Sequence, residues 1–243
     1  MDQELEDFVA SCERRPLSRM EELLSTLLYR FLPPYEVHGL LAMYPMHLMS
    51  EAQWKRVVPE LLRGGSLLDV GAGQGFVTER ARGLFPDIVT AETSRSMVRR
   101  LRSKGFRAAH VDLSSGVSSF EPKSFDVISI LNVLDRCARP RTLLSNAIDL
   151  LKDDGVVIVS DPLPIRQRVL EHGARPEERI ATIEDASWER NLVDFYETAI
   201  RPAGLVPVLV TRLPYLSQEA PPEKLFVLDA FLMVCRKASA RGI

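Results

Sequence analysis

A glycine-rich loop is the first segment of this sequence that could do chemistry. Gly71, Gly73 and Gly75 alternate directly after a short apolar run, and Asp69 lies two positions before the first of them. Glycines let a chain turn tightly and let a ligand approach the backbone without meeting a side chain. A strand before such a loop and a helix after it are typical of nucleoside-binding sites. We therefore expect Asp69, Gly71, Ala72 and Gly73 to contact a nucleoside.

The spacing of the residues around this loop bears on which nucleoside it binds. A dinucleotide fingerprint would have its third glycine at position 76, where this chain has Phe76. Glu92 lies 17 residues after Gly75, at the end of the next predicted strand. A carboxylate there can accept hydrogen bonds from both ribose hydroxyls of a nucleoside. The same contact would suit NAD or S-adenosylmethionine (AdoMet), so Glu92 does not decide between them. The alternative is that Glu92 is a solvated surface residue without a ligand. Asp112, after the following strand, is a candidate for the adenine end, with ordinary turn chemistry as the alternative.

A second candidate site follows the fourth predicted strand, in Asn132-Val133-Leu134-Asp135-Arg136-Cys137. Asn132 and Asp135 are three residues apart, so one helical turn would place both side chains on the same side of a site. Capping of the following helix is the alternative. The string lacks the Asn/Asp-Pro-Pro-aromatic signature with which nucleic-acid amino-methyltransferases hold an amine. Asp161-Pro162-Leu163-Pro164 is similar to that signature, but it falls after the fifth strand and lacks the aromatic residue.

Strands and helices that alternate along the chain must position these residues. Predicted strands cover 66–70, 88–92, 107–111, 125–131 and 156–159, and predicted helices cover 76–85, 95–104 and 141–151. This rhythm is typical of parallel βαβ units with helices on both faces of the sheet. A helix over 188–200 and two late strands, over 205–211 and 226–235, complete the domain. Because no helix separates the late strands, we expect them to form an antiparallel pair at the edge.

Residues 1–60 are predicted to form an N-terminal helical extension, and residues 61–243 the main domain. Leucines recur at helical spacing from Leu23 to Leu28, until Pro33-Pro34 ends the pattern. Ser50-Glu51-Ala52-Gln53 matches a capping box at the start of a further helix. Residues 162–184 have weak periodicity and are expected to form an irregular insertion over the site.

Composition excludes several classes of protein. The 243 residues are 46% hydrophobic and 26% charged, with a net charge of −2, which fits one globular domain and argues against binding to nucleic acid through bulk charge. No apolar run approaches the ~20 residues of a membrane helix. The acidic start, Met1 to Asp7, does not resemble a secretion signal. Cys12, Cys137 and Cys235 include no C-x-x-C pair, so we expect no disulfide framework, no zinc site and an intracellular, cytoplasmic location.

The remaining reactive residues predict neither a metal centre nor a nucleophile. None of the histidines forms a pair at the spacing of metal ligands, and none lies in a His-x-His string; they are His38, His47, His110 and His172. Cys137 lies beside the second candidate site but has no recognisable histidine partner, so we interpret it as structural.

Several of these motifs together resemble a known family. Leu68 to Gly75, followed by Glu92, is similar to motif I of the class I AdoMet-dependent methyltransferases. The string Asn132 to Cys137, the later Arg212-Leu213-Pro214-Tyr215-Leu216 and the late Val227-Leu228-Asp229-Ala230 look like the DREV family, in this order. The resemblance runs from about Met46 to the C-terminus. The glycine loop alone specifies only the superfamily, whereas the later strings are specific to the family.

The DREV resemblance implies a fold, a cofactor and a reaction. The fold is the Rossmann-like class I methyltransferase fold, an α/β fold with a mostly parallel seven-stranded sheet and an antiparallel edge strand. The cofactor is AdoMet, released as S-adenosylhomocysteine. The reaction is that of a protein-histidine N-pros-methyltransferase, which methylates Nδ1 of histidine in His-x-His sequences with small x. Some relatives carry a hydrophobic leader, so endomembrane association is the alternative to a cytoplasmic location.

The resemblance also implies roles for individual residues. The implied cofactor contacts are Glu92 and the glycine loop, with Asp69, Gly71, Ala72 and Gly73. Asp112 and Asn132 are further candidates for contact with the cofactor. The residues implied to contact the target histidine are Asp135, Asn132 and Tyr215. Tyr215 lies in a predicted loop after a late strand. Without the resemblance, ordinary packing would explain a tyrosine at this position equally well. Two other functions remain open: methylation of a small imidazole compound such as a histidine dipeptide, and a catalytically silent AdoMet-binding module. We expect protein or peptide partners, no nucleic acid, no membrane span and no metal.

Overall fold

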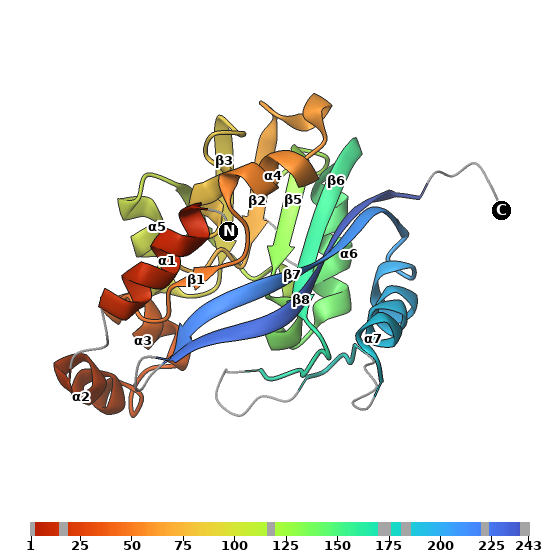
Figure 1. Cartoon of the computed structure of the whole chain (residues 1–243). Helices are drawn as coiled ribbons and strands as arrows, with labels where there is room; N and C mark the ends of the chain where they lie inside the picture. The colour runs from red at the N-terminus through yellow and green to blue at the C-terminus, as the bar shows by residue number, and fades with distance from the viewer. Residues whose placement is uncertain are drawn as a thin grey trace.

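The computed structural model describes residues 3–14, 19–115, 120–169, 176–180, 186–219 and 224–238 (Figure 1). The strands within this part of the chain are β1 (Met46–His47), β2 (Ser66–Val70), β3 (Asp87–Glu92), β4 (Arg107–His110), β5 (Phe125–Leu131), β6 (Leu151–Pro162), β7 (Leu205–Glu219) and β8 (Lys224–Lys237). The α-helices are α1 (Gln3–Arg14), α2 (Arg19–Leu28), α3 (Pro34–Leu41), α4 (Glu51–Val57), α5 (Arg95–Ser103), α6 (Pro140–Leu150) and α7 (Trp188–Phe195). The short turns are the 3₁₀-helices η1 (Glu60–Leu62), η2 (Thr78–Ala81), η3 (Leu113–Ser115) and η4 (Leu134–Arg136) and the π-helical turn η5 (Tyr196–Ile200).

The strands form one sheet in the order β1-β7-β8-β6-β5-β2-β3-β4. The four strands β2 to β5 pair in parallel, and β5 also pairs in parallel with β6, as the βαβ rhythm predicts. The pairs β6–β8, β7–β8 and β1–β7 are antiparallel. The predicted α/β fold of the class I methyltransferase type is confirmed.

Two details of the predicted sheet are corrected. The described sheet has eight strands instead of seven, because the two-residue strand β1 adds to its edge through Met46 and His47. A strand of this length has no periodicity that a sequence pattern could reveal. The long antiparallel strand β8 lies between β6 and β7, inside the sheet, and the edge is formed by β1. The β7–β8 hairpin crosses the front of the molecule as a long ribbon (Figure 1).

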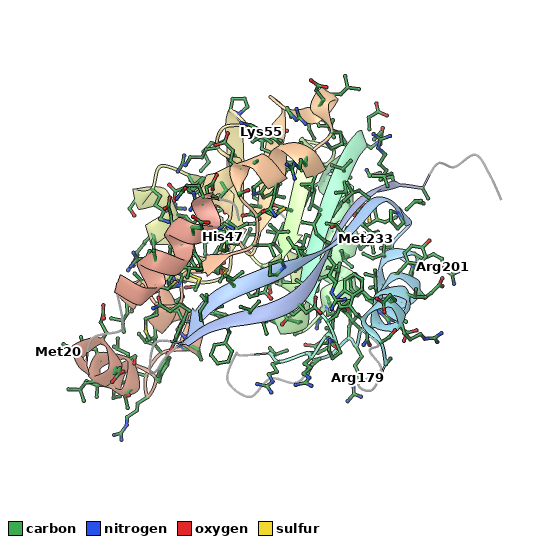
Figure 2. The ribbon with its side chains drawn as sticks, viewed as in Figure 1. Met20, His47, Lys55, Arg179, Arg201 and Met233 are labelled. Carbon is green, nitrogen blue, oxygen red and sulfur yellow. The ribbon has the colours of Figure 1, made fainter. Side chains whose placement is uncertain are left out.

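The core lies on both faces of the sheet, because side chains alternate along each strand. On β2, Leu68 and Val70 pack with the buried leucines of α6, whereas Leu67 packs on the opposite face with Trp54 of α4. These helices cover opposite faces of the sheet (Figure 1). Met233 of β8 is 1% exposed, whereas Met20 of α2 lies at the periphery (Figure 2).

The predicted helices are mostly confirmed. The capping box at the start of α4 is present, since Gln53 N donates to Ser50 Oγ and Ser50 N donates to Gln53 Oε1. The predicted helix over 76–85 is wrong: only the short turn η2 forms. Gly75 has a φ of +79°, and the Thr78 hydroxyl donates to a carboxylate beneath the loop, so this segment follows the loop instead of winding regularly.

The N-terminal segment packs against helix α5 of the main domain through α3. The Glu36 carboxylate accepts hydrogen bonds from Arg95 N at 2.7 Å and Ser96 N at 2.9 Å, at the start of α5. Gly39 lies against the same turn, where a Cβ atom would come within 2.9 Å of the side chain of Met97. Residues 163–169 form neither helix nor strand, as expected of an insertion, and part of the predicted insertion lies outside the described residues. The division between residues 60 and 61 stays a prediction.

In the described part of the chain, no helix has the length and apolar character that a membrane crossing requires. The described residues also hold no cluster of three or more histidine, cysteine or carboxylate side chains that could bind a metal ion. His172 lies outside the described residues.

Candidate active site

A cavity of about 550 Å³ opens at the carboxyl ends of β2, β3 and β5. This is the edge at which open α/β sheets bind ligands, and the volume is ordinary for a small-molecule site. The predicted site residues that line it are Gly71, Ala72, Gly73, Glu92, Asp112, Asn132, Asp135 and Tyr215. Residues that are far apart in sequence therefore meet at one place.

The glycine loop has a conformation that requires glycine. Gly71 and Gly73 have φ values of +69° and +56°, in the left-handed region. A Cβ on Gly71 would lie 2.5 Å from Val133 Cγ2, so the loop packs tightly against the segment that follows β5. A Cβ on Gly73 would meet no atom within 4 Å, because this side of the loop faces the cavity. Gly73 leaves room for a ligand that a larger residue would fill.

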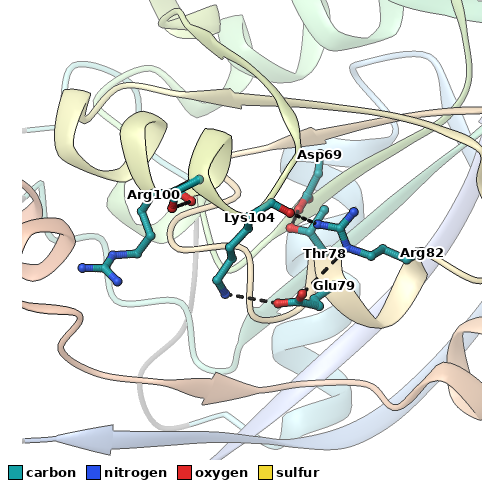
Figure 3. Close-up of polar contacts among 7 residues, drawn as sticks. Asp69, Thr78, Glu79, Arg82, Arg100 and Lys104 are labelled. Atoms are coloured by element: carbon teal, nitrogen blue, oxygen red, sulfur yellow. Dashed lines mark hydrogen bonds and ion pairs between the residues drawn. The ribbon is translucent and has the colours of Figure 1, made fainter.

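Asp69, predicted as a cofactor contact, does not line the cavity. Its carboxylate points into the protein and accepts hydrogen bonds from Thr78 Oγ1 at 2.5 Å and Ser129 Oγ at 2.6 Å. Figure 3 shows Asp69 and Thr78 beneath the loop, near the exposed ion pair of Glu79 and Lys104. Burial raises the pKa of Asp69 to about 6, against the effect of the two hydroxyl donors. Asp69 thus holds β2, β5 and η2 together beneath the loop.

Glu92 lies at the end of β3, buried and facing the cavity. Its Oε2 accepts from Gly73 N at 2.9 Å, and its Oε1 accepts from Thr93 N at 2.7 Å and Ser94 N at 3.0 Å. Burial raises the pKa of Glu92, and these backbone donors oppose the shift. Each carboxylate oxygen has two lone pairs, so Glu92 can fix the glycine loop and still accept from a ribose.

Asp112 lies at the cavity and also forms a turn. It lines the cavity, and its Oδ1 accepts from Ser114 N at 2.8 Å and from Ser114 Oγ at 2.7 Å, which is ordinary turn chemistry. The cofactor contact of Asp112 stays a prediction.

Asn132 and Tyr215 come together across the sheet. Asn132 Nδ2 donates to Tyr215 Oη at 3.0 Å, and Tyr215 Oη contacts Met46 Sδ at 3.4 Å. Tyr215 lies within β7 instead of the predicted loop, because β7 continues to Glu219 opposite β8. Pro214 does not interrupt the strand, although proline has no backbone N–H. Strand β1 pairs with β7 only from Leu216 onward, so at Pro214 the side of β7 that faces β1 has no partner strand and needs no N–H donor.

Asp135 lies in η4 beside a half-buried arginine. Arg136 Nε is 3.6 Å from Asp135 Oδ2, and Arg136 also hydrogen bonds to Tyr35 of α3. Burial raises the pKa of Asp135, and Arg136 opposes the shift. Burial also raises the pKa of Tyr35 to about 12 and, together with Arg136, lowers that of His38 to about 4. Both rings are therefore neutral around pH 7.

The sequence patterns missed three residues of this site. Tyr35 and His38 line the cavity from a segment that is recognised in the sequence only as helical. Asp161, beside Asp135, lies in the string set aside because it lacks an aromatic residue. Only the neighbouring position of β6 and β5 reveals it. Cys137 also lines the cavity, and burial raises the pKa of its thiol to about 11, so it is protonated at neutral pH.

Residues 17–237 match the family described as DREV methyltransferase. The chain belongs to this family. Demethylmenaquinone methyltransferase of Tropheryma whipplei (strain Twist) is 28% identical over 121 residues, which are 48% of this chain and 51% of that protein. The chain thus matches about half the length of the curated relatives.

Two solved structures share the fold. A protein of Bacillus halodurans C-125 classed as a methyltransferase has a TM-score of 0.54 and 12% identity, and the match covers 78% of this chain and 99% of that one. The N-methyltransferase NodS of Bradyrhizobium japonicum WM9, solved with S-adenosylhomocysteine, has a TM-score of 0.51 and 17% identity, with coverage of 78% and 86%. These two likenesses show that this DREV family member has the fold of a methyltransferase.

Proposed function

We propose that this DREV methyltransferase transfers the methyl group of AdoMet to Nδ1 of histidine in protein or peptide His-x-His sequences with a small middle residue. The observation that carries the proposal is a pair of acceptors at one wall of the cavity. Asn132 Oδ1 and Asp135 Oδ1 are buried, and no N–H or hydroxyl group of the described residues donates to either. Both side chains line the cavity, so they suit a substrate that brings its own N–H group.

Imidazole meets this requirement. Free histidine titrates near ~6.5, so at pH 7 most of it is neutral and offers one N–H donor and one lone pair. If Asp135 accepts a hydrogen bond from Nε2–H, the tautomer is fixed and the lone pair is on Nδ1. In the transfer, the bond from Nδ1 to the methyl carbon forms while the bond from sulfur to that carbon breaks. The imidazolium that results is stabilised by the Asp135 carboxylate and afterwards loses its proton to water.

The remaining residues position the reactants. AdoMet, when bound, supplies an electrophilic methyl group on its sulfonium. The open side of Gly73 and the carboxylate of Glu92 would hold the amino-acid and ribose parts of AdoMet. Asn132, oriented by Tyr215, would hold the imidazole ring in line with the methyl carbon and the sulfur, and such alignment supplies most of the rate.

The experiment uses labelled AdoMet and two matched peptides that differ in one residue, His-Ala-His and His-Trp-His. We expect methylation of the first and poor methylation of the second, with the methyl group located on Nδ1 by mass spectrometry and by NMR of the ring. Equal rates for the two peptides would contradict the expected requirement for a small middle residue. Faster methylation of a free histidine dipeptide would favour the small-molecule alternative. Binding of AdoMet without any turnover would favour the silent module.

A further inference from the structure

We propose that Asp161 carries a proton at neutral pH and donates it to a hydrogen bond with Asp135, so that a neutral carboxylic acid positions the catalytic carboxylate. The placement of the proton follows from the structure alone. Its consequence for catalysis rests on the function proposed for Asp135.

Burial is the first step in the argument. Asp161 is the second-last residue of β6, opposite Phe231 of β8, and its side chain is 0% exposed. Neither of its carboxylate oxygens receives a side-chain donor from the described residues, and the donor nearest to them is the main chain of Asp135. An ionised carboxylate in such a place would be desolvated and would have no ion pair of its own, which is among the most costly arrangements in a protein interior.

The neighbouring group supplies the second step. The carboxyl groups of Asp161 and Asp135 lie within hydrogen-bonding reach of each other. Two ionised carboxylates offer only acceptors and repel each other, so the contact becomes favourable when one proton lies between them. A single proton satisfies one oxygen of each group.

The third step assigns the proton to Asp161 and not to Asp135. Arg136 Nε is 3.6 Å from Asp135 Oδ2, and Asp135 borders the cavity, so its negative charge has both a counter-ion and access to water. Each carboxyl group of the pair is affected by the charge of the other and by that of Arg136. Tyr35 and Tyr215 are the titratable groups around the Arg136 guanidinium. Burial, followed by repulsion from Asp135, raises the pKa of Asp161 well above its ordinary value.

This arrangement gives Asp161 a positioning role. The strand β6 is paired on both sides near its end, so it holds the acid group rigidly. A neutral donor fixes the orientation of Asp135 and opposes its protonation, since hydrogen bonding to the charged form favours that form. Asp135 can then accept from the cavity with its remaining lone pairs.

Two variants of nearly equal size separate a donor from a mere space filler. Asp161→Asn has a neutral side chain that can still donate, whereas Asp161→Leu has a similar shape and no donor. We expect Asp161→Asn to keep most of the wild-type kcat on a His-Ala-His peptide. We expect Asp161→Leu to lose about 10–100-fold, the usual effect of removing a residue that orients a reacting group, with AdoMet affinity unchanged.

Infrared spectroscopy of the whole protein tests the proton directly. At neutral pH the wild type should show the C=O stretch of one buried carboxylic acid, and Asp161→Asn should lack this band. The proposal is overturned by absence of the band in the wild type. Wild-type kcat in Asp161→Leu, or a kcat in Asp161→Asn as low as in Asp135→Asn, would overturn it as well. If the wild type methylates no histidine peptide but shows the band, the proposed function fails and the protonated Asp161 stands.

Discussion

Asn132 has an unusual backbone for its position. It directly follows β5 and has a φ of +59°, in the left-handed region that asparagine tolerates better than most residues. Asn132 N donates to Ser160 O at 2.6 Å, so the chain is anchored to β6 at this point. This turn lets the side chain reach Tyr215, and it places η4 with Asp135 over the cavity. One residue therefore determines the direction of the whole segment.

At this scale we predict that Asp135→Asn lowers the single-turnover rate about 10²–10³-fold, because it removes the charge that stabilises the developing imidazolium. AdoMet affinity, measured by calorimetry, should hardly change, since the loop contacts are elsewhere. Asn132→Ala should also slow the reaction, and a double-mutant cycle should show overlapping instead of additive losses, because Asn132 acts on the same imidazole ring. A wild-type rate in Asp135→Asn would show that the assigned role is wrong.

Glu92→Ala should weaken AdoMet binding. The variant removes charge-assisted hydrogen bonds to the ribose, each worth about 1.5–3 kcal/mol, or a factor of roughly 10–150 in Kd. It also removes the acceptor for Gly73 N, so the loop loses support. Glu79→Ala is the matched control, because Glu79 lies beside the same loop without lining the cavity. Equal AdoMet affinity of the two variants by calorimetry would contradict the ribose contact.

At the scale of the structural elements, the conformation of the glycine loop depends on the positive φ of its glycines. Gly73→Val should abolish measurable AdoMet binding, since a branched side chain would fill the part of the cavity beside Gly73. Gly64→Val is the control, because Gly64 also has a positive φ, +85°, and also lacks neighbours within 4 Å of its Cβ position, but lies away from the cavity. Both variants carry similar backbone strain, so both should lose stability, and only the first should lose AdoMet. Equal loss of AdoMet affinity in both variants would mean that backbone strain, and not the filling of the cavity beside Gly73, weakens binding.

Asp69 connects β2, β5 and η2, and its titration should be visible in stability. Its pKa is raised to about 6 in the folded protein, against ~3.9 when unfolded. The folded state thus binds the proton more tightly, so the stabilising contribution is complete below pH ~4 and is lost as pH rises through about 6. The free energy of unfolding of the wild type, minus that of Asp69→Asn, should fall by about 2 kcal/mol from pH 4 to 7.

Urea unfolding at a series of pH values measures this difference. Asp154→Asn, which changes an exposed aspartate, should show no comparable trend. A difference between wild type and Asp69→Asn that does not vary with pH would mean that Asp69 titrates as in the unfolded chain.

For the whole molecule, the contact between α3 and α5 couples the N-terminal segment to the site. Burial alone would raise the pKa of Glu36, but the donors at Ser96 and Arg95 outweigh it and lower the pKa. The contribution of Glu36 to stability is therefore present above its unfolded pKa and is lost as pH falls through the folded pKa. Through α3 it also places Tyr35 and His38 at the cavity.

Glu36→Ala should lower the free energy of unfolding by about 1 kcal/mol at pH 7, the typical value of a helix cap. It should also raise the KM for the peptide, because Tyr35 and His38 lose their support. Glu60→Ala, at an exposed position, is the control. An unchanged KM in a destabilised Glu36→Ala would show that α3 supports the fold but not the site.

The sequence alone determined the local elements and the chemistry that depends on local spacing. Short apolar runs indicated β2, β3, β5 and β8, and the capping box indicated α4, because each of these signals lies within a few consecutive residues. The glycine loop, with Glu92 at the end of the next strand, indicated a nucleoside site, and the resemblance to the class I methyltransferases indicated AdoMet. The DREV strings added the candidate catalytic residues.

Only the tertiary structure decided which distant residues meet. Asp69 turns into the protein because Thr78 of η2 and Ser129 of β5 offer donors there, and Ser129 is 60 residues away in sequence. Tyr215 reaches Asn132 because β7 extends along β8 for its full length. Asp161 meets Asp135 because β6 is the neighbour of β5. Strand order and register are long-range choices of packing, so no local pattern specifies them.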